Sequence, residues 1–325
     1  MFRKGQILNK AIRGLIIFLI AGSGVMAGCT NPVATTRSVQ DAAPQGILDL
    51  PTYIPGTVFV YASGRWDTVE NVDKDSVQWL NHRGDRSVGS HDFTFRPLSW
   101  ESKTHEGTRT FEHAQFVFGR KAYSLWPLSV GKTSGYFEIN KWHPKGGPFR
   151  TYRAYWSCEV EGDAKVTVPA GKFDTLKVAC ARFSGKNSSS TAFAREYRAW
   201  YYAPEINHWV AYEREYRGED RRVTRKRLAA ILPVLERDGI SDSDRVEMDR
   251  FFQNSLQTSQ EGVTHAWHSG SGVVQMDMTQ MQTFQRNDRT TCRQYQQTLI
   301  IEGKREKYYG VACKGVENKW NVPQI

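Results

Sequence analysis

Cysteine is the residue type whose spacing most clearly predicts chemistry in this chain. The five cysteines are Cys29, Cys158, Cys180, Cys292 and Cys313. The last four form two pairs, whose members lie 22 and 21 residues apart. Paired thiols of an exported chain become disulfides in an oxidising compartment, so we predict two disulfides. The alternatives are buried free thiols and a zinc site, although no Cys-x-x-Cys motif or histidine cluster accompanies the pairs.

Four cysteines allow three connectivities, and the pattern of strands favours bonding within each pair. Residues 291–301 and 304–314 are predicted to be antiparallel strands joined by a two-residue turn at 302–303. This register places Cys292 opposite Cys313, at a non-hydrogen-bonded position where side chains come closest. A four-residue loop with the same centre would still place Cys292 opposite Cys313, but at a hydrogen-bonded position of the ladder.

The first pair needs an additional feature in its hairpin. A turn centred on Ala170 would place Cys180 opposite Val160, two residues out of register with Cys158. A β-bulge near residues 161–163 would remove this offset. We therefore expect a bulged hairpin to carry the first disulfide.

The N-terminus has the pattern of a secretory signal peptide. Residues 1–13 carry four Lys or Arg side chains and no acidic one, and an apolar run follows at residues 14–21. This run is too short for a membrane span of about 20 residues. Because four basic residues belong to the signal, the mature chain is less basic than the formal charge of +10 indicates. This difference weakens a nucleic-acid-binding interpretation, and we predict no nucleic-acid partner.

The end of this segment, Met-Ala-Gly-Cys at residues 26–29, resembles the lipobox of bacterial lipoproteins. The resemblance implies that Cys29 is acylated, with palmitate among its chains, and becomes the first residue of the mature chain. The membrane is then a partner through this anchor, because two or three acyl chains hold a protein nearly permanently. Thr30 stands where Asp would resemble an inner-membrane retention signal, which favours the outer membrane. The alternative is an ordinary cleaved signal with an incidental cysteine.

We divide the chain into four parts. They are a signal peptide at 1–28, a lipidated tether at 29–50, an antiparallel β domain at 51–228 and a helix-plus-sheet domain at 229–325. The chain is predicted to be mainly β, or α+β overall. Many short strands separated by turn residues predict an antiparallel β-sandwich or half-barrel for the first domain, and residues 92–96 are among these strands.

One helix is predicted in the second domain, and residues 242–244, Asp-Ser-Asp, suit its N-terminus. Asp244 and Glu247 fit a capping box, and Gly262 suits the end of the helix. An apolar stripe at helical spacing predicts the face that packs on a small antiparallel sheet. The residues of this stripe are Met248, Phe251, Phe252 and Leu256.

A run of basic residues lies between residues 217 and 227. One interpretation is a solvated edge strand or a connector between domains. The other is contact with anionic lipid headgroups on a membrane surface. The residues assigned to this contact are Arg221, Arg222, Arg225, Lys226 and Arg227.

Residues from about 267 to 322 resemble the C-terminal domain of rickettsial-type surface-antigen lipoproteins. The similar segments are Trp-His-Ser-Gly-Ser-Gly at 267–272, Cys-Arg-Gln-Tyr-Gln-Gln-Thr at 292–298, Gly-Val-Ala-Cys at 310–313, and Trp320. The resemblance implies a non-catalytic module anchored in the cell envelope. Lys314 departs from the usual Arg, residues 316–318 replace a Pro-Asp-Gly turn, and the upstream glycine zipper of these antigens is missing.

Residues 51–216 show a fainter resemblance to envelope β-domains of unknown function. It is carried by the Val-Pro-Ala-Gly turn at 168–171 and the Tyr-Tyr-Ala-Pro-Glu turn at 201–205. Asn207 stands where Gly is expected. This resemblance implies no activity.

Residue types with catalytic or metal-binding potential do not form a recognisable motif. The eight histidines make no His-Glu-x-x-His motif, and the serines at 269 and 271 lack a Gly-x-Ser-x-Gly context. Neither a P-loop nor a dinucleotide fingerprint occurs, and the aspartates near residue 242 lack the order of an EF-hand. We therefore predict no enzyme, no metal and no cofactor. A catalytic triad assembled from distant residues stays an alternative.

Together these patterns predict a lipid-anchored outer-membrane protein with a structural or interaction role, whose partner is another envelope protein. A first alternative is a carrier for a hydrophobic ligand, such as an acyl chain or a lipoprotein segment, held in an aromatic-lined groove. A second is an enzyme of unrecognised type.

Overall fold

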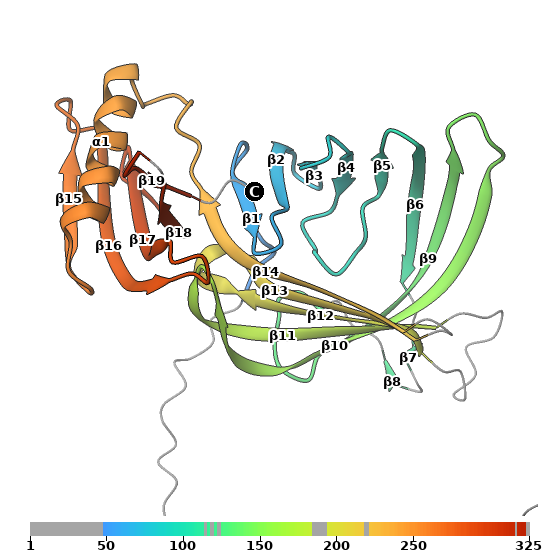
Figure 1. Ribbon diagram of the computed structural model, residues 1–325. Helices are drawn as coiled ribbons and strands as arrows, with labels where there is room; N and C mark the ends of the chain where they lie inside the picture. Colours follow the sequence, from blue (N-terminus) through green and yellow to red (C-terminus); the bar gives the residue numbers. More distant parts are fainter. Residues whose placement is uncertain are drawn as a thin grey trace, which may run out of the picture. The chain divides into compact units, whose positions relative to one another are not determined.

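The computed structural model describes residues 48–113, 116–117, 120–121, 125–183, 194–217, 221–315 and 317–322. The predicted signal peptide, Cys29 and nearly all of the predicted tether lie outside the described residues. Residues 45–325 form one compact unit. Its two main parts are a barrel and a smaller sheet, which pack against each other (Figure 1).

The barrel consists of antiparallel strands, in the order β1-β14-β13-β12-β11-β10-β9-β6-β5-β4-β3-β2. Their bounds are β1 (Val58–Tyr61), β2 (Trp66–Val72), β3 (Val77–Asn81), β4 (Arg86–Gly89), β5 (Ser99–Glu101), β6 (His105–His113), β9 (Thr133–Pro144), β10 (Arg150–Val168), β11 (Gly171–Phe183), β12 (Ala194–Ala203), β13 (His208–Tyr216) and β14 (Arg222–Leu232). A short pair, β7 (Phe116–Val117) and β8 (Arg120–Lys121), lies apart, and the single-turn η1 (Pro204–Ile206) joins β12 to β13.

β14 closes the barrel, because it pairs with β13 on one side and with β1 on the other. The prediction of an antiparallel β domain is confirmed, but the domain is a closed barrel rather than a sandwich or half-barrel. The first half of β14 carries exposed basic residues, and its second half buries Leu228 and Ala230. Because exposed basic residues come before the buried apolar ones, the first half of β14 was interpreted as an edge strand or a connector between domains. The boundary that we placed between residues 228 and 229 stays a prediction, and β14 continues to Leu232.

Alternation of buried and exposed residues builds the barrel wall. On β12 and on residues 176–183 of β11 every second side chain is buried, as expected for strands with one face toward the interior. The buried residues of β12 include Trp200 and Tyr202, but also Glu196 and Arg198. The barrel interior is therefore apolar in some rows and charged in others.

An inner loop, residues 90–98 between β4 and β5, folds into the barrel. The Phe93 ring lies 5.4 Å from that of Tyr202 and 5.6 Å from that of Trp126. The Phe95 ring lies 4.7 Å from that of Tyr136. The loop thus fills the interior with aromatic side chains.

The strand predicted at residues 92–96 is therefore wrong. The carboxylate of Asp92 accepts hydrogen bonds from the backbone N–H and the hydroxyl of Thr94, at 2.9 and 2.7 Å. An Asx turn of this kind competes with strand pairing, because it satisfies backbone groups locally. The alternation of Phe93 and Phe95, which suggested a strand, instead positions two rings in the core.

The smaller part of the unit is a five-stranded antiparallel sheet covered by helix α1 (Asp242–Thr258). The strand order is β15-β16-β17-β18-β19, with bounds β15 (Thr264–His268), β16 (Val274–Gln285), β17 (Thr291–Ile301), β18 (Lys304–Lys314) and β19 (Trp320–Asn321). Met248 and Leu256 are buried, and the Phe252 ring packs 5.2 Å from that of Tyr295 on β17. The predicted core face of the helix is confirmed.

The ends of α1 differ from the prediction. Ser241 is the N-cap and forms a capping box with Asp244, whereas we placed the box at Asp244 and Glu247. Asp244 still takes part, but as the N3 residue whose carboxylate returns to the cap. The helix ends at Thr258 rather than near Gly262, whose N–H bonds to a carbonyl of β16.

The sheet packs against the barrel through β18. The Tyr309 hydroxyl donates a hydrogen bond to Glu205, and its ring lies 5.1 Å from that of Phe173. A Cβ added at Gly310 would lie 3.1 Å from the Cβ of Ala230 on β14 and 2.6 Å from the Tyr295 hydroxyl. The two backbones approach closely because this position has no side chain.

Both disulfides are present, and each joins directly opposed residues of neighbouring strands. Cys292 faces Cys313 because the turn at 302–303 has two residues with positive φ, 48° and 78°, as in a type I′ turn. In the other hairpin the turn residues are 169–170, so the register is off by one residue rather than two. A one-residue bulge at Glu161 restores it, within the segment predicted to bulge.

Truncation of the inner loop provides a test of its packing role. We expect Phe93→Ala to lower the free energy of unfolding by roughly 3 kcal/mol, the low end for such substitutions because the ring is only partly buried. Phe149→Ala is the matched control, since that ring is 74% exposed and its loss should change stability by less than about 0.5 kcal/mol. Urea unfolding of both variants measures this difference, and equal stabilities would show that the loop does not hold the interior.

Candidate functional site

Two glutamates lie fully buried on the inner face of the barrel. Glu138, on β9, accepts a hydrogen bond from the indole N–H of Trp156 at 2.7 Å. Its other oxygen lies 3.2 Å from a guanidinium nitrogen of Arg96 and 3.1 Å from Nε of Arg109. This inward carboxylate is stable because the indole N–H and two guanidinium groups surround it.

Glu196, on β12, is held by three more arginines. Nε of Arg182 donates to one carboxylate oxygen at 2.8 Å. Arg198 and Arg214 donate to the other oxygen, with shortest distances of 2.6 and 2.7 Å. Burial opposes ionisation, but the charges of Arg198 and Arg214 outweigh it and lower the pKa of Glu196 to about 2.

We call these residues the arginine–glutamate network: Glu138, Glu196, Arg96, Arg109, Arg182, Arg198 and Arg214. Its two halves face one another across the interior. Burial lowers the pKa of Arg96, and so do the positive charges of Arg198 and Arg214, which belong to the other half. Burial and the charge of Arg96 lower the pKa of Arg109 to about 9. Like charges are thus close enough to repel.

The network is partly open to solvent. The side chains of Arg109, Arg182 and Arg198 are less than one-tenth exposed, whereas those of Arg96 and Arg214 are 29% and 32% exposed. Arg96 and Arg214 are therefore the arginines of the network with most contact with solvent.

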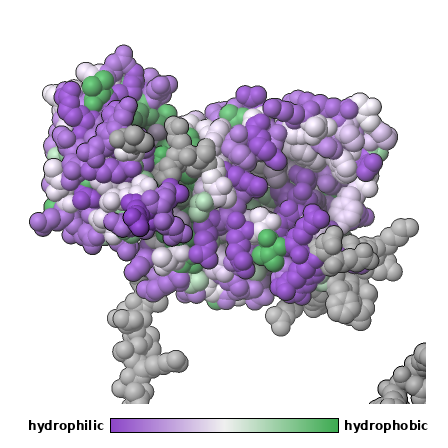
Figure 2. All heavy atoms as spheres, in the orientation of Figure 1, coloured by the Kyte–Doolittle hydropathy of each residue, from purple (hydrophilic) through white to green (hydrophobic). Residues whose placement is uncertain are grey.

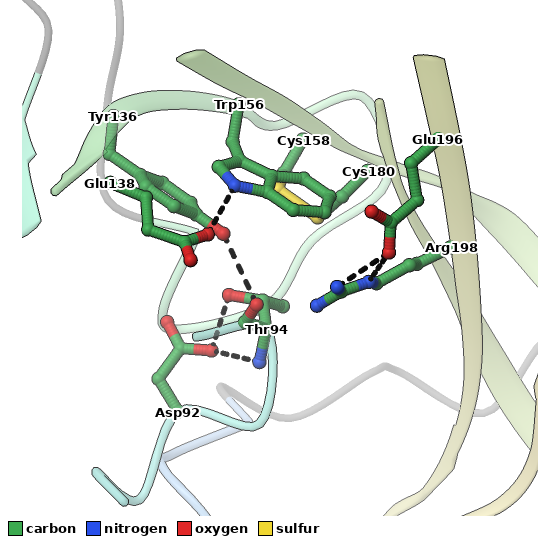
Figure 3. Close-up of a disulfide and its surroundings, with 9 residues drawn as sticks. All are labelled: Asp92, Thr94, Tyr136, Glu138, Trp156, Cys158, Cys180, Glu196 and Arg198. Atoms are coloured by element: carbon green, nitrogen blue, oxygen red, sulfur yellow. Dashed lines mark hydrogen bonds and ion pairs between the residues drawn. A yellow bond between two sulfur atoms is a disulfide. The ribbon is translucent and has the colours of Figure 1, made fainter. Parts of the chain in front are cut away.

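The first disulfide lies in the same cross-strand row as two arginines of the network. Cys158, Cys180, Arg198 and Arg214 are paired in sequence across β10, β11, β12 and β13. The Arg198 guanidinium lies 4.4 Å from the centre of the Trp156 ring. Figure 3 shows this ring between Glu138 on one side and Arg198 on the other, with the disulfide beside it. The covalent bond thus fixes the two strands that carry Trp156 and Arg182.

A separate aromatic cluster surrounds His208 on β13. Burial, and secondarily the charge of Lys226, lower the pKa of His208 to about 3. Its ring lies 3.9 Å from that of Phe59, and its Nδ1 is 3.4 Å from the Tyr53 hydroxyl. His208 is therefore neutral at physiological pH and behaves as a packed ring.

The basic run of β14 forms pairs on both faces of the barrel wall. On the outer face, Arg225 lies 3.2 Å from Glu213 and Arg221 lies 3.0 Å from Glu215. Arg222 and Arg227 are exposed. On the inner face, Lys226 lies 3.0 Å from Asp67 and 4.5 Å from the centre of the Tyr61 ring. Contact of this run with anionic lipid stays a prediction.

The described residues also line two clefts. One, of about 450 Å³, runs along β3 to β6 and is lined by charged residues together with Trp100 and Phe149. The other, of about 910 Å³, lies where β1 and β2 meet α1 and β19, next to Trp66, Phe252 and Trp320.

Two properties of the described residues bear on the predicted chemistry. No group of three or more His, Cys, Asp or Glu residues there could hold a metal ion. Within the same residues, no helix has the length and apolar character of a membrane span.

The arginine–glutamate network was not predicted from the sequence. A signal for it exists in β12, where Glu196 and Arg198 have the same parity as Trp200 and Tyr202. Charged residues in phase with buried aromatics on one strand indicate inward charges. The partners could not have been found, because Arg96 comes from a loop and Arg109 from a strand that we had not predicted.

The C-terminal region is similar to the rickettsial 17 kDa surface antigens. Identity is 28% over 84 residues with the protein of Rickettsia bellii and 30% over 84 residues with that of Rickettsia conorii. These segments cover 26% of this chain, and the chain spans about half, 53%, of the length of these relatives. The resemblance predicted for the C-terminal residues is confirmed.

No protein-family model matches the chain. Among solved structures, the hypothetical lipoprotein YmcC from Escherichia coli aligns with 55% of this chain and 89% of its own length. The TM-score is 0.35 and the identity 9%, and we base no argument on this likeness.

Removing the negative charge of Glu196 tests the balance of the network. We expect Glu196→Gln to lower the free energy of unfolding by about 3–5 kcal/mol, because Arg182 and Arg198 would remain buried without a counter-charge. Glu215→Gln, which affects the pairs with Arg217 and Arg221 on the outer face, should cost at most about 1 kcal/mol. Guanidinium unfolding at neutral pH measures both, and a similar cost for the two variants would contradict the role of burial.

The lowered pKa of His208 predicts a dependence of stability on pH. Between its ordinary pKa of 6.5 and about 3, the unfolded chain binds a proton at this residue and the folded chain does not. Stability is therefore fully present above pH 6.5 and decreases as the pH falls. From pH 6.5 to about pH 5, the wild type should lose about 2 kcal/mol more than His208→Phe, which keeps a ring but cannot titrate. Urea unfolding at the two pH values checks this, and parallel losses would refute it.

Proposed function

We propose that this protein is a lipid-anchored envelope protein of the outer membrane that acts by binding rather than by catalysis. The observation that carries the proposal is the pair of cross-strand disulfides, one in the barrel and one in the C-terminal sheet. Disulfides persist in proteins that fold outside the reducing cytosol. The predicted signal and lipobox at Cys29 supply the route of export and the anchor.

The similarity of the C-terminal region to proteins named surface antigens supports an envelope location. The residues that carry the sequence resemblance belong to the sheet: the hairpin of β17 and β18, closed by Cys292–Cys313, and Trp320 on β19. The face in Figure 2 is largely hydrophilic, as expected for a domain held off the bilayer by a tether. We infer that the sheet and the barrel wall present surfaces to another envelope protein.

The alternative of a hydrophobic carrier has less support. The aromatic side chains that we expected to line a groove for an acyl chain instead pack against one another. The rings of Phe93, Phe95, Tyr136, Trp200 and Tyr202 fill the described interior together. Neither described cleft is lined by any of these rings.

Replacement of the anchoring cysteine tests the proposal. We expect Cys29→Ser to move the protein from the membrane fraction to the soluble fraction, because no acyl chain can then be attached. The lipobox resemblance also implies that Thr30→Asp keeps the protein membrane-bound but shifts it from the outer to the inner membrane, while Thr30→Ala leaves it in place. Fractionation of cells expressing each variant measures this, and retention of Cys29→Ser in the membrane would overturn the proposal.

A further inference from the structure

The arginine–glutamate network contains more positive charge than negative. Among the described residues, five guanidinium groups surround two carboxylates. Guanidinium stays protonated in proteins, and Glu196 with its pKa of about 2 is ionised at neutral pH. Arg182 also contacts the hydroxyls of Tyr152 and Tyr216, which do not cancel a charge. Asp92 of the inner loop is a third carboxylate in this group of side chains, beside Thr94 in Figure 3. Because the five guanidinium groups outnumber these three carboxylates, this part of the inner face carries an excess of cations.

Other contacts reduce the electrostatic cost of this excess positive charge without removing it. The Arg109 guanidinium lies 3.8 Å from the centre of the Trp100 ring, and it donates to the carbonyl of Pro97. Arg214 lies 4.7 Å from the centre of the Tyr216 ring. Cation–π contacts and carbonyl acceptors stabilise a guanidinium, but like charges still repel one another in a medium of low dielectric constant.

Two arginines of the network are in contact with solvent. Arg96 comes from the inner loop and Arg214 from β13, and the side chains of both are about one-third exposed, whereas Arg198 is buried near them. The three arginines thus come from a loop and from two adjacent strands. A planar carboxylate is poorly suited to such an arrangement, whereas a tetrahedral phosphate presents oxygens to several guanidinium forks at once.

We propose that the arginine–glutamate network is a binding site for a phosphate monoester group, held by Arg96, Arg198 and Arg214. Two negative charges on the ligand offset most of the excess, and Glu138 and Glu196 hold the guanidinium groups in position before the ligand arrives. This inference does not depend on the location of the protein in the envelope. The class of ligand is a phosphorylated sugar, a phosphorylated lipid headgroup or free phosphate, which share this group.

Calorimetric titration of the full-length protein in neutral detergent tests the site. Inorganic phosphate is added at constant ionic strength, with chloride as the reference anion. We expect binding by the wild type, and a loss of affinity of about tenfold or more in Arg96→Gln and in Arg214→Gln, because each removes a charge-assisted hydrogen bond. Arg225→Gln is the matched control, since it removes the same charge from the outer face of the adjacent strand.

Two further titrations distinguish the sources of the phosphate group. Glucose 1-phosphate represents a phosphorylated sugar, and short-chain phosphatidic acid, with phosphatidylcholine as its control, represents a lipid headgroup. Tighter binding of one of them than of inorganic phosphate, with the same dependence on Arg96 and Arg214, supports the site and identifies the source. Absence of binding by all three, or an equal loss in Arg225→Gln, overturns the proposal.

Thermal unfolding supplies a second readout that separates a ligand site from a purely structural cluster. Without phosphate, Arg214→Gln should be at least as stable as the wild type, because it relieves repulsion. With saturating phosphate, the wild type should become the more stable of the two, because ligand binding to the folded state raises the Tm. Arg214→Lys keeps the charge but loses the forked set of guanidinium donors. Its gain in Tm with phosphate should therefore lie between the gains of the wild type and of Arg214→Gln. A wild type that is more stable by the same margin with and without phosphate contradicts the site.

Discussion

The ion pairs of Glu196 are the interaction on which the inner face of the barrel depends. One carboxylate joins arginines from three consecutive strands, because Arg182 lies on β11, Arg198 on β12 and Arg214 on β13. Each of these side chains would be costly to bury by itself. The carboxylate is held ionised by the charges that it balances, as its pKa of about 2 indicates. The register of β11 to β13 is therefore tied to electrostatics as well as to apolar packing.

Much of the fold could be predicted from the sequence where polarity alternates clearly. The hairpin of β17 and β18 agrees with its predicted bounds, and its turn and disulfide follow from the spacing alone. The core face of α1 was predicted from Met248 and Leu256, because helical spacing of apolar residues is a strong signal. The ends of the helix were less predictable, since Ser241 and Asp244 compete with neighbouring acidic residues as caps.

The closure of the barrel and the candidate site could not be predicted in the same way. β14 begins with exposed basic residues, so its first half lacks the apolar alternation of a barrel strand. The inner loop has that alternation but forms no strand, because Asp92 and Thr94 satisfy each other locally. Arg96 and Glu138 are 42 residues apart. A contact at that distance depends on closure, and no local pattern contains it.

Stability alone does not explain why the barrel keeps this network. Well-packed apolar residues at the positions of a buried ion pair are often neutral or more stabilising. The same barrel fills its other inward rows with Val160, Val178, Trp200 and Tyr202, so its geometry accommodates apolar side chains there. The charged rows instead contain the disulfide and contact the inner loop, the two features that hold the interior in place. Rigid support of costly charges is characteristic of sites built to meet a ligand, because preorganised groups need little rearrangement on binding.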